Sequence, residues 1–341
     1  MICHSFPLAD SEIESDLLQL INEWNLNESI SISTSGSTGK PAEIKLKKRL
    51  IEWSATATKK ALNLAEEKTL ICISTNKIGG RMMLYRSFLF QWPFCIIEPM
   101  ADPLKAIAMN HDFTFVSLVP YQLSTILENE SSVEKLKQFK TVLIGGAAIP
   151  EKLEAQIVQI THSCKTTFFH SYGMTETASH IAIRNIGEDG FKILSGVHCS
   201  TNENSQLMIS IPEADIQIIT NDLVKLHDGR IYLNGRVDEV INSGGVKLNI
   251  KDLETRLEKW HVENNINLRF FLWKQSDEKL GERLIFVGLN RDKSNCKKES
   301  FLIFDKFEIP KNTYWVNDFE MTESGKIDKR RTVEKLVEIR G

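Results

Sequence analysis

Two segments of the sequence gather side chains that could bind an anion or a metal ion. In the first segment, a glycine-containing loop brings together hydroxyl groups, one cation and backbone N–H groups. These groups could converge on a phosphate. The segment is not a Walker A motif, in which four residues separate the two glycines and Ser or Thr follows the lysine. Taken alone, it is equally compatible with a polar surface turn. Its residues are Thr34, Ser35, Gly36, Ser37, Thr38, Gly39, Lys40 and Pro41.

The second segment is Ser171–Thr177, which directly follows a predicted strand over residues 166–170. Ligands bind at the carboxyl ends of strands in open α/β sheets, so this position favours a site. Tyr172 offers an aromatic face for a purine, Thr175 a hydroxyl, and Glu176 a hard oxygen ligand suited to Mg²⁺. A strand-to-helix turn with a threonine cap is the alternative.

Three further features are weak by themselves. Gly145 and Gly146 follow a predicted strand and would let the backbone approach a flat ligand closely. Asp222 and Arg236 could bind ribose hydroxyls or phosphate, although such residues are more often partners in surface salt bridges. The Gly-Lys pair that ends at Lys326 lies in a predicted turn, where a lysine is usually solvated.

The elements that must position these segments form two predicted domains. From residue 70 to 172, β-branched and aromatic runs alternate with amphipathic helical patterns, which predicts a mostly parallel sheet covered on both faces. Closely spaced strands from 192 to 233 predict a small antiparallel β unit, and the remainder predicts a separate small α+β domain. We therefore expect an α/β fold with domains at 1–237 and 238–341. The predicted parallel strands are 70–74, 94–97, 114–119, 141–144 and 166–170, the helices between them are 81–90, 104–110, 121–129 and 151–160, and the later strands are 192–197, 206–211, 215–220, 223–226 and 230–233.

Composition, charge and motif searches disfavour several classes of protein. The 42 Lys and Arg against 45 Asp and Glu give a net charge of −3, so no basic field favours nucleic acid. The cysteines and histidines lack zinc-site spacings, and no G-x-S-x-G elbow indicates a serine hydrolase. Neither a signal peptide nor an apolar run long enough to span a bilayer is visible, so we expect a cytoplasmic protein without membrane insertion.

Taken in chain order, these features resemble the adenylate-forming superfamily of acyl-CoA synthetases, luciferases and peptide-synthetase adenylation domains. The segment 34–41 looks like the phosphate loop of this family, and 172–176 resembles its adenine and magnesium motif. The stretches 220–222, 235–239 and 324–326 resemble its ribose, hinge and catalytic-lysine motifs. Five motifs in the family's order imply an AMP-forming enzyme that activates a carboxylic acid with ATP.

Within the superfamily, the sequence is most similar to the o-succinylbenzoate–CoA ligases of menaquinone synthesis. The similarity lies in Ser171–Ser179 and in Gly79–Arg86, which resembles their early pocket helix. It implies that o-succinylbenzoate, ATP and CoA are the small-molecule partners, that Mg²⁺ is the cofactor, and that an acyl-adenylate forms before transfer to CoA. A homodimer is a further possibility.

The resemblance also implies a role for each matching residue. Residues 34–40 would hold the β- and γ-phosphates, Asp222 and Arg236 would hold ribose, and Asp238 would be the hinge between the domains. Lys326, Thr175 and Glu176 would be catalytic, with Glu176 also the magnesium ligand. The remaining assignments are Gly146, Ser171, Tyr172 and Gly173 at the nucleotide, Ser243, Gly244 and Gly245 at CoA, and Lys77, Arg86, Ser179 and His180 at the substrate acid.

The sequence also departs from the family pattern. Ala42 and Glu43 stand where the phosphate loop usually has Lys-Gly, so Lys40 or Lys45 would have to replace the lost cation. Most relatives carry a long segment before this loop, which implies a short form of the N-terminal domain here. Three alternatives remain open: a ligase for another aryl or fatty acid, an enzyme that loads a carrier protein, and a nucleotide-binding relic without catalysis. Asn221, Glu320 and Lys77 replace the family's ribose-motif glycine, a proline before the catalytic lysine and a pocket histidine.

Overall fold

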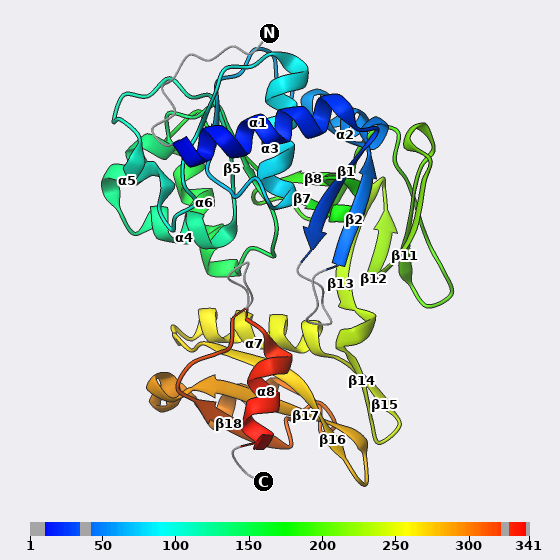
Figure 1. Cartoon of the computed structure of the whole chain (residues 1–341). Helices are drawn as coiled ribbons and strands as arrows, with labels where there is room; N and C mark the ends of the chain where they lie inside the picture. The colour runs from blue at the N-terminus through cyan, green and yellow to red at the C-terminus, as the bar shows by residue number, and fades with distance from the viewer. Residues whose placement is uncertain (1–10, 35–41, 322–326, 339–341) are drawn as a thin grey trace. The chain divides into compact units, whose positions relative to one another are not determined.

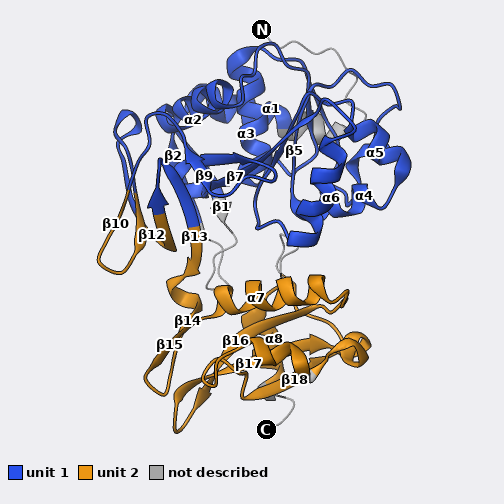
Figure 2. Ribbon diagram, turned by 180° about the vertical axis from the view of Figure 1, so that it is seen from behind, with its two compact units in different colours: residues 1–199, 209–218, 226–232 blue, residues 200–208, 219–225, 233–341 orange. Residues whose placement is uncertain are grey.

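The computed structural model describes residues 11–34, 42–321 and 327–338 (Figure 1). The chain divides into two compact units, which Figure 2 shows in different colours. Unit 1 comprises residues 1–199, 209–218 and 226–232, and unit 2 comprises residues 200–208, 219–225 and 233–341. We describe each unit by itself, and the domain limits at 237 and 238 stay a prediction.

The parallel half of an 11-stranded sheet forms the centre of unit 1. Strands β4, β3, β5, β6 and β7 lie side by side in that order, and each neighbouring pair is parallel. Three of these strands are buried along their whole length, which explains why their sequences are mostly apolar, with one Thr or Ser in each. The strands are β3 (Thr69–Ile71), β4 (Phe94–Ile96), β5 (Phe115–Leu118), β6 (Thr141–Ile144) and β7 (Thr167–Gly173).

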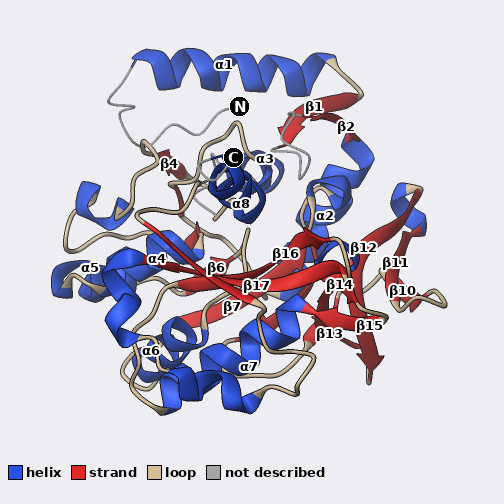
Figure 3. Cartoon of the chain, turned by 90° about the horizontal axis from the view of Figure 1, so that it is seen from below, coloured by secondary structure: helices blue, strands red, loops and turns tan. Residues whose placement is uncertain are grey.

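Helices cover both faces of these parallel strands. Leu123 of α4 and Ile157 of α6 belong to one hydrophobic cluster with Leu70 of β3. Thr69 points to the opposite face, where its Oγ1 lies 2.8 Å from the Oγ of Ser87 in α3. Figure 3 shows α4, α5 and α6 grouped together. The helices are α2 (Lys48–Ala61), α3 (Ile78–Phe90), α4 (Pro120–Leu127), α5 (Glu130–Leu136) and α6 (Glu151–Thr161).

A two-stranded hairpin and a helix precede this sheet. Strands β1 (Ser29–Thr34) and β2 (Ala42–Lys47) are antiparallel and form a sheet of their own. Helix α1 (Ser11–Leu26) contacts β1 and is joined to α3, because Arg81 Nη1 donates to Glu23 Oε2 over 3.0 Å. No helix is predicted from the sequence before residue 70, so α1 and α2 are seen only in the structure.

The antiparallel strands continue the same sheet instead of forming a separate β unit. Strand β8 pairs antiparallel with β7, and the order then runs through β9, β13, β12 and β11 to β10. The predicted strands 215–220 and 223–226 are one strand, because Asp222 keeps its backbone extended, with its N–H donating to Thr220 Oγ1. The α/β fold class is confirmed. The strands are β8 (His180–Asn185), β9 (Phe191–Ile193), β10 (His198–Thr201), β11 (Gln206–Ile211), β12 (Ile216–His227) and β13 (Arg230–Arg236).

Unit 2 contains a five-stranded sheet with one long helix on each face. Strands β15, β14, β17 and β16 follow in that order, and β18 pairs parallel with β17. Leu257 of α7 packs on one face with Phe286, whereas Val333 of α8 packs on the other with Val287. The elements are β14 (Val240–Ser243), β15 (Val246–Asn249), α7 (Ile250–Glu263), β16 (Phe270–Asp277), β17 (Gly281–Leu289), β18 (Asn312–Val316) and α8 (Lys329–Glu338).

The predicted helix 104–110 is wrong. The structure has only a 3-10 turn, Pro103–Ala106, because the Asp102 side chain accepts the N–H of Leu104. Lys135 Nζ then donates to the carbonyl oxygens of Leu104 and Ile107, which an α-helix would have used. In the part of the chain that the structure describes, no helix has both the length and the apolar character needed to cross a membrane. The other 3-10 turns are Thr175–Thr177 (η2), Pro212–Ala214, Val237–Glu239 (η4), Asn290–Asn295 and Lys298–Ile303.

Candidate active site

The glycine loop after β6 lies next to the carboxyl end of β7. Ile144, the last residue of β6, is paired with His170 in the register of these parallel strands, so Gly145 lies beside Ser171, which is still part of β7. Ser171 Oγ donates to the carbonyl oxygen of Ile144 over 3.0 Å, and a Cβ on Gly145 would lie 2.6 Å from that hydroxyl oxygen. A side chain at position 145 would therefore displace the Ser171 hydroxyl. The structure brings together two features that the sequence presented separately.

Tyr172 and the 3-10 turn η2 extend this edge. The Tyr172 ring lies 5.8 Å from the ring of Phe191, centroid to centroid. A Cβ on Gly173 would lie 2.4 Å from the carbonyl oxygen of Ser179, so only glycine lets β7 pass so close to the start of β8. Thr177 Oγ1 donates to that same carbonyl oxygen over 2.7 Å and fixes the turn. Within η2, Thr175 is half-buried and Glu176 is exposed.

The hairpin that flanks the predicted phosphate loop belongs to the same edge of unit 1. Thr34 at the end of β1 is opposite Ala42 at the start of β2, so the two ends of the loop are held together. Strand β2 contacts η2, the turn that carries Thr175 and Glu176. Ser35, Gly36, Ser37, Thr38, Gly39 and Lys40, which the sequence assigns to phosphate binding, lie outside the described residues.

Three of the predicted substrate-acid residues form one buried cluster. Arg86 Nη2 donates to the Oγ of Ser179 over 2.7 Å and to the Oγ1 of Thr58 over 3.1 Å. The two ring nitrogens of His180 lie 3.0 Å from the Ser179 hydroxyl and 3.2 Å from the Thr58 hydroxyl. Thr58 lies on α2 and was missed by sequence reasoning, although Ser54 and Thr58 are polar residues four apart on the buried side of that helix.

The cluster holds a cation without a neutralising partner. Only 2% of Arg86 is exposed, and in the described ranges of the chain no carboxylate pairs with its guanidinium. Burial lowers the pKa of Arg86 to about 9, so the group is still charged at neutral pH. Burial, together with the Arg86 charge, lowers the pKa of His180 to about 3, so this imidazole is neutral. The Nε of Arg86 is buried and lacks a hydrogen-bond partner among the described residues.

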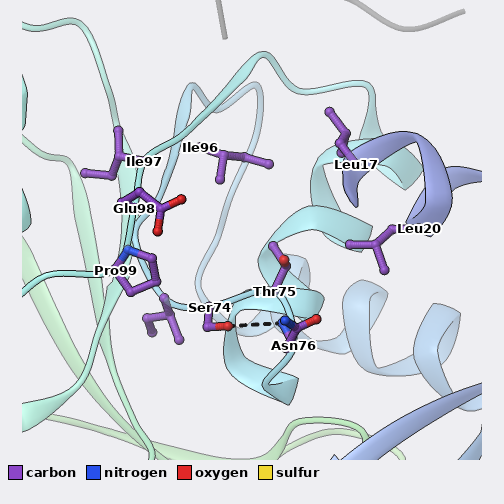
Figure 4. Close-up of a pocket in the computed structure, with 10 residues that line it drawn as sticks. Leu17, Leu20, Ser74, Thr75, Asn76, Ile96, Ile97, Glu98 and Pro99 are labelled. Carbon is purple, nitrogen blue, oxygen red and sulfur yellow. Dashed lines mark hydrogen bonds between the residues drawn. The ribbon is translucent and has the colours of Figure 1, made fainter. Parts of the chain in front are cut away.

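The fourth predicted acid-binding residue, Lys77, is not part of this cluster. It precedes the first residue of α3, whereas Arg86 lies near the other end, about 13 Å further along the helix axis at ~1.5 Å per residue. A cavity of about 130 Å³ adjoins this end of the helix, at the carboxyl ends of β3 and β4 (Figure 4). A whole ligand needs several hundred Å³, so this cavity is too small for one. It is lined by Leu17, Leu20, Ile73, Ser74, Thr75, Asn76, Ile96, Ile97, Glu98 and Pro99.

The two predicted ribose-binding residues contact each other within unit 2. Arg236 Nη1 donates to Asp222 Oδ1 over 2.8 Å, and Arg236 Nε donates to Asp238 Oδ1 over 3.0 Å. Burial lowers the pKa of Arg236, but the carboxylates of Asp222 and Asp238 outweigh it and the net shift is upward. Asp222 is largely buried, so this ion pair fixes the direction of its carboxylate. Asp238, the predicted hinge, lies in the turn η4.

The predicted CoA-facing residues form a tight turn of unit 2. Gly244 and Gly245 connect β14 to β15 with φ angles of +60° and +87°, as a two-residue hairpin turn with both central residues left-handed requires. Ser243 is buried beside this turn. The turn geometry alone accounts for the two glycines, and it also leaves their backbone without side chains.

Two paired residues flank the segment that the sequence assigns to the catalytic lysine. Lys326 lies outside the described residues, but Met321 and Ile327 on either side form an isolated antiparallel bridge. Lys329, the first residue of α8, donates to both carboxylate oxygens of the buried Glu254 over 2.7 and 2.8 Å. The described residues on both sides of the segment belong to unit 2, where Lys329 joins α8 to α7 through Glu254.

Comparisons with known proteins identify the family of the chain. The family model of the AMP-binding enzymes matches residues 29–236. A crystal structure from Dyadobacter fermentans, described as an acyl-CoA synthetase (AMP-forming)/AMP-acid ligase II-like protein, is 32% identical with a TM-score of 0.64 and covers 97% of each chain. The 2-succinylbenzoate–CoA ligase of Listeria monocytogenes is 22% identical over 96% of this chain and 74% of its own. The o-succinylbenzoate coenzyme A synthetase of Bacillus subtilis, solved with ATP and magnesium, is 19% identical, with a TM-score of 0.71 over 89% of this chain and 69% of its own.

Proposed function

Because the chain belongs to the family of AMP-binding enzymes, we propose that it activates a carboxylic acid with ATP and transfers the acyl group to CoA. The acid that we propose is o-succinylbenzoate. The curated relatives that cover most of the chain are named for this substrate, and they support the choice. One observation carries the proposal: the glycine loop after β6, the Ser171–Glu176 segment at the carboxyl end of β7 and the β1–β2 hairpin all meet at one edge of unit 1.

In the first half-reaction, the acid carboxylate attacks the α-phosphorus of ATP and pyrophosphate leaves. The acid oxygen forms the new O–P bond, and the bond to the β-phosphate oxygen breaks. Gly146 and Tyr172 would border adenine, and Thr34 and the loop after it would hold the phosphates. Charge builds up on the phosphoryl oxygens, so positioning and electrostatic stabilisation are the main tasks of the protein.

The residues present fit a magnesium ion that arrives with ATP. Mg²⁺ usually takes one or two carboxylates together with phosphate oxygens and waters. Glu176 offers one exposed carboxylate on η2, beside the half-buried Thr175. No group of three or more His, Cys, Asp and Glu among the described residues could hold a metal alone. When bound, the ion would neutralise phosphate charge, and Glu176 would orient it.

Ribose and the later steps would use residues of unit 2. Asp222, held by Arg236, would accept hydrogen bonds from the ribose hydroxyls. Lys326 would bridge the acid carboxylate and the α-phosphate in the first half-reaction. The CoA thiol would then attack the acyl carbonyl, and AMP would leave. In this proposal, unit 2 turns about Asp238 between the steps, and the backbone of Gly244 and Gly245 lets the pantetheine arm pass.

The Arg86 cluster supports an acid with a second carboxylate. After one carboxylate of o-succinylbenzoate has reacted with ATP, the other stays charged and needs a cation. Arg86 is a buried cation without a carboxylate partner in the part of the chain that the structure describes. The partly buried Ser179 hydroxyl is the group through which this charge would act on the ligand. Lys77 remains a second candidate at the other end of α3.

Pyrophosphate exchange tests this proposal with a panel of acids. The enzyme is incubated with ATP, Mg²⁺ and labelled pyrophosphate, and label in ATP is measured with o-succinylbenzoate, aryl acids, fatty acids or no acid. We expect exchange that depends on o-succinylbenzoate. Exchange with another acid alone would replace the substrate, and no exchange with any acid would indicate a nucleotide-binding relic. Adding CoA or a carrier protein to the active mixture identifies the acceptor.

The proposal also includes the setting in which the enzyme works. Its co-substrates ATP and CoA are cytoplasmic metabolites, so we propose the cytoplasm as its location. A homodimer stays a prediction, which light scattering after gel filtration would test. Neither point affects the assignment of the residues above.

A further inference from the structure

Four residues from four segments of unit 1 form one chain of hydrogen bonds that ends at the glycine loop. Arg184 Nη2 donates to Glu154 Oε2 over 2.7 Å and lies 3.2 Å from the Nδ1 of His170. His170 Nε2 lies 3.2 Å from the carbonyl oxygen of Ala147. Glu154 belongs to α6, Arg184 to β8 and His170 to β7, and Ala147 follows Gly146 in the loop after β6. The chain therefore connects a partly buried ion pair to this loop.

The chemistry of these groups fixes the direction of every bond. An arginine can only donate, so the contact from Arg184 requires a lone pair on Nδ1 of His170. The proton of the neutral imidazole must then be on Nε2, which donates to the Ala147 carbonyl oxygen. His170 is 6% exposed, and burial together with the Arg184 charge lowers its pKa to about 4. At neutral pH, His170 is thus a fixed donor aimed at the loop.

The other contacts of these side chains keep this geometry in place. His170 and Arg184 are directly opposite each other in the β7–β8 register. The Phe191 ring lies 5.0 Å from the His170 ring and 5.4 Å from the Arg184 guanidinium. The same Phe191 ring lies 5.8 Å from that of Tyr172. One aromatic side chain therefore packs on the donor to the glycine loop and on the residue that we assign to adenine.

The loop itself has few other means of holding its shape. Gly146 has a φ of +83° and is exposed, and the N–H of Gly145 donates to the carbonyl oxygen of Leu118 over 3.1 Å. The carbonyl oxygen of Ala147 has His170 as its partner. A glycine pair has many accessible conformations, so this bond restricts the loop on the side that faces β7.

We propose that His170 is a positioning residue for the nucleotide, which holds the Gly146 loop beside Tyr172 through the carbonyl oxygen of Ala147. Arg184 and Glu154 would act through His170 by fixing which ring nitrogen carries the proton. The inference rests on the proposed function for its ligand, ATP, but not for its geometry. It names no contact between His170 and ATP itself.

Two substitutions at this position separate hydrogen bonding from packing. His170→Phe keeps a buried ring but removes the donor, whereas His170→Gln keeps one donor and one acceptor. The matched control is His111→Phe, which removes another histidine contact to a backbone carbonyl, 2.9 Å from Nε2 to the Lys135 oxygen, away from the site. All variants are the full chain, and circular dichroism and thermal unfolding check that each one folds.

Hydrogen–deuterium exchange of residues 145–149 in the nucleotide-free protein is the first measurement. We expect His170→Phe to speed exchange in this loop about tenfold, with His170→Gln close to the wild type. His111→Phe should leave the loop unchanged. Unchanged exchange in His170→Phe would overturn the proposal whatever the activity, because the loop would then not depend on the bond.

The second measurement is the KM for ATP against the KM for the acid in pyrophosphate exchange. We expect His170→Phe to raise the KM for ATP about tenfold, the effect of losing one hydrogen bond, with the KM for the acid changed less than about twofold. Equal changes in both values, or the same change in His111→Phe, would mean that the effect is one of stability, which overturns the inference. A wild-type protein without ATP-dependent exchange would refute the proposed function and the nucleotide role, while the loop measurement would still test the geometry.

Discussion

Arg86 Nη2 donates to the Oγ of Ser179 over 2.7 Å, although the two residues are 93 positions apart in the chain. The contact joins α3 to the start of β8, directly after the turn that carries Glu176. It places a buried positive charge behind the segment that we assign to the nucleotide and the metal. An uncompensated buried cation costs stability, so its presence calls for a functional explanation.

We predict that Arg86→Met raises the KM for o-succinylbenzoate by roughly 10- to 100-fold, the effect of losing a charge-assisted hydrogen bond. The KM for ATP should stay within about twofold. The methionine side chain fills much of the same volume without a charge, so the free energy of unfolding should be unchanged or higher. Urea denaturation and steady-state kinetics with each substrate varied in turn measure these effects.

The control for this variant is an acid of similar shape without the second carboxylate. If Arg86 acts on that carboxylate, its substitution will leave the KM for the monocarboxylate unchanged. An unchanged KM for o-succinylbenzoate in Arg86→Met would remove Arg86 from the acid site, and Lys77→Met would then be the next variant to measure.

The Asp222–Arg236 pair leads to a second prediction, for ribose. Asp222→Asn removes the negative charge that Arg236 holds at 2.8 Å, and with it one of the two acceptor oxygens proposed for the ribose hydroxyls. We expect the KM for ATP to rise about tenfold, with little change for the acid. The matched control is Glu188→Gln, which breaks the ion pair of Glu188 with Arg230 at 3.1 Å without touching a proposed site residue. A similar rise in both variants would contradict the ribose assignment.

How far the fold could be predicted from the sequence depended on burial. Strands such as Thr141–Ile144 were predicted because a strand buried on both faces is a continuous apolar run. Helix α2 was missed because Thr56 and Thr58 are poor helix formers, and only the structure shows their hydroxyls bonded to carbonyls four residues earlier. The predicted helix 104–110 failed for a long-range reason, since Lys135 takes the carbonyl groups that it needed.

Part of the candidate site could also be predicted from the sequence, and part could not. Gly146 and Tyr172 could each be placed at the carboxyl end of a predicted strand, and the structure brings their segments side by side, with Tyr172 still part of β7. Thr58 could not be found, because it meets His180 across 122 residues of chain and belongs to no motif. The role proposed for His170 could not be predicted either. It depends on Arg184, which lies opposite His170 only because β8 pairs antiparallel with β7.

A third prediction concerns Lys326, which the resemblance assigns to the first half-reaction. Lys326→Ala should abolish formation of the acyl-adenylate, but it should leave thioester formation from supplied acyl-adenylate and CoA largely intact. Pyrophosphate exchange measures the first step and release of AMP measures the second. Lys335→Ala, in the following helix, is the matched control, because that lysine pairs with Glu320 at the surface. Equal loss of both steps would contradict a role limited to adenylation.

The buried histidines of unit 1 make stability depend on pH. Burial lowers the pKa of His170 from 6.5 to about 4 and that of His180 from 6.5 to about 3. Below pH 6.5 these histidines therefore bind protons in the unfolded chain but not in the folded chain. As a result, the free energy of unfolding falls as the pH falls. Each histidine contributes at most about 1.4 kcal/mol per pH unit in this range. His261 of unit 2, whose pKa burial lowers to about 4, has the same sign.

Urea denaturation at pH 7 and pH 5.5 measures this effect above the range in which carboxylates titrate. His170→Gln cannot take up a proton, so its loss of stability between these two pH values should be smaller than that of the wild type by about 1 kcal/mol. If the wild type and the variant lose the same stability between these pH values, His170 titrates normally in the folded protein.

Two adjacent glycines at the start of α3 provide the last prediction. A Cβ on Gly80 would lie 2.3 Å from the carbonyl oxygen of Ile73 and 2.4 Å from that of Ser74, so α3 could not keep its close contact with the chain after β3. Gly80→Ala should therefore lower the free energy of unfolding by about 1–3 kcal/mol. A Cβ on Gly79 would have only ordinary contacts, at 3.8 Å from Ile73, and Gly79→Ala should raise stability by up to about 1 kcal/mol through helix propensity. Because the two variants add the same methyl group one residue apart, urea denaturation of the pair isolates the steric effect. Equal stabilities would mean that the backbone at Gly80 can move away, and that the tight packing of α3 on β3 does not determine its position.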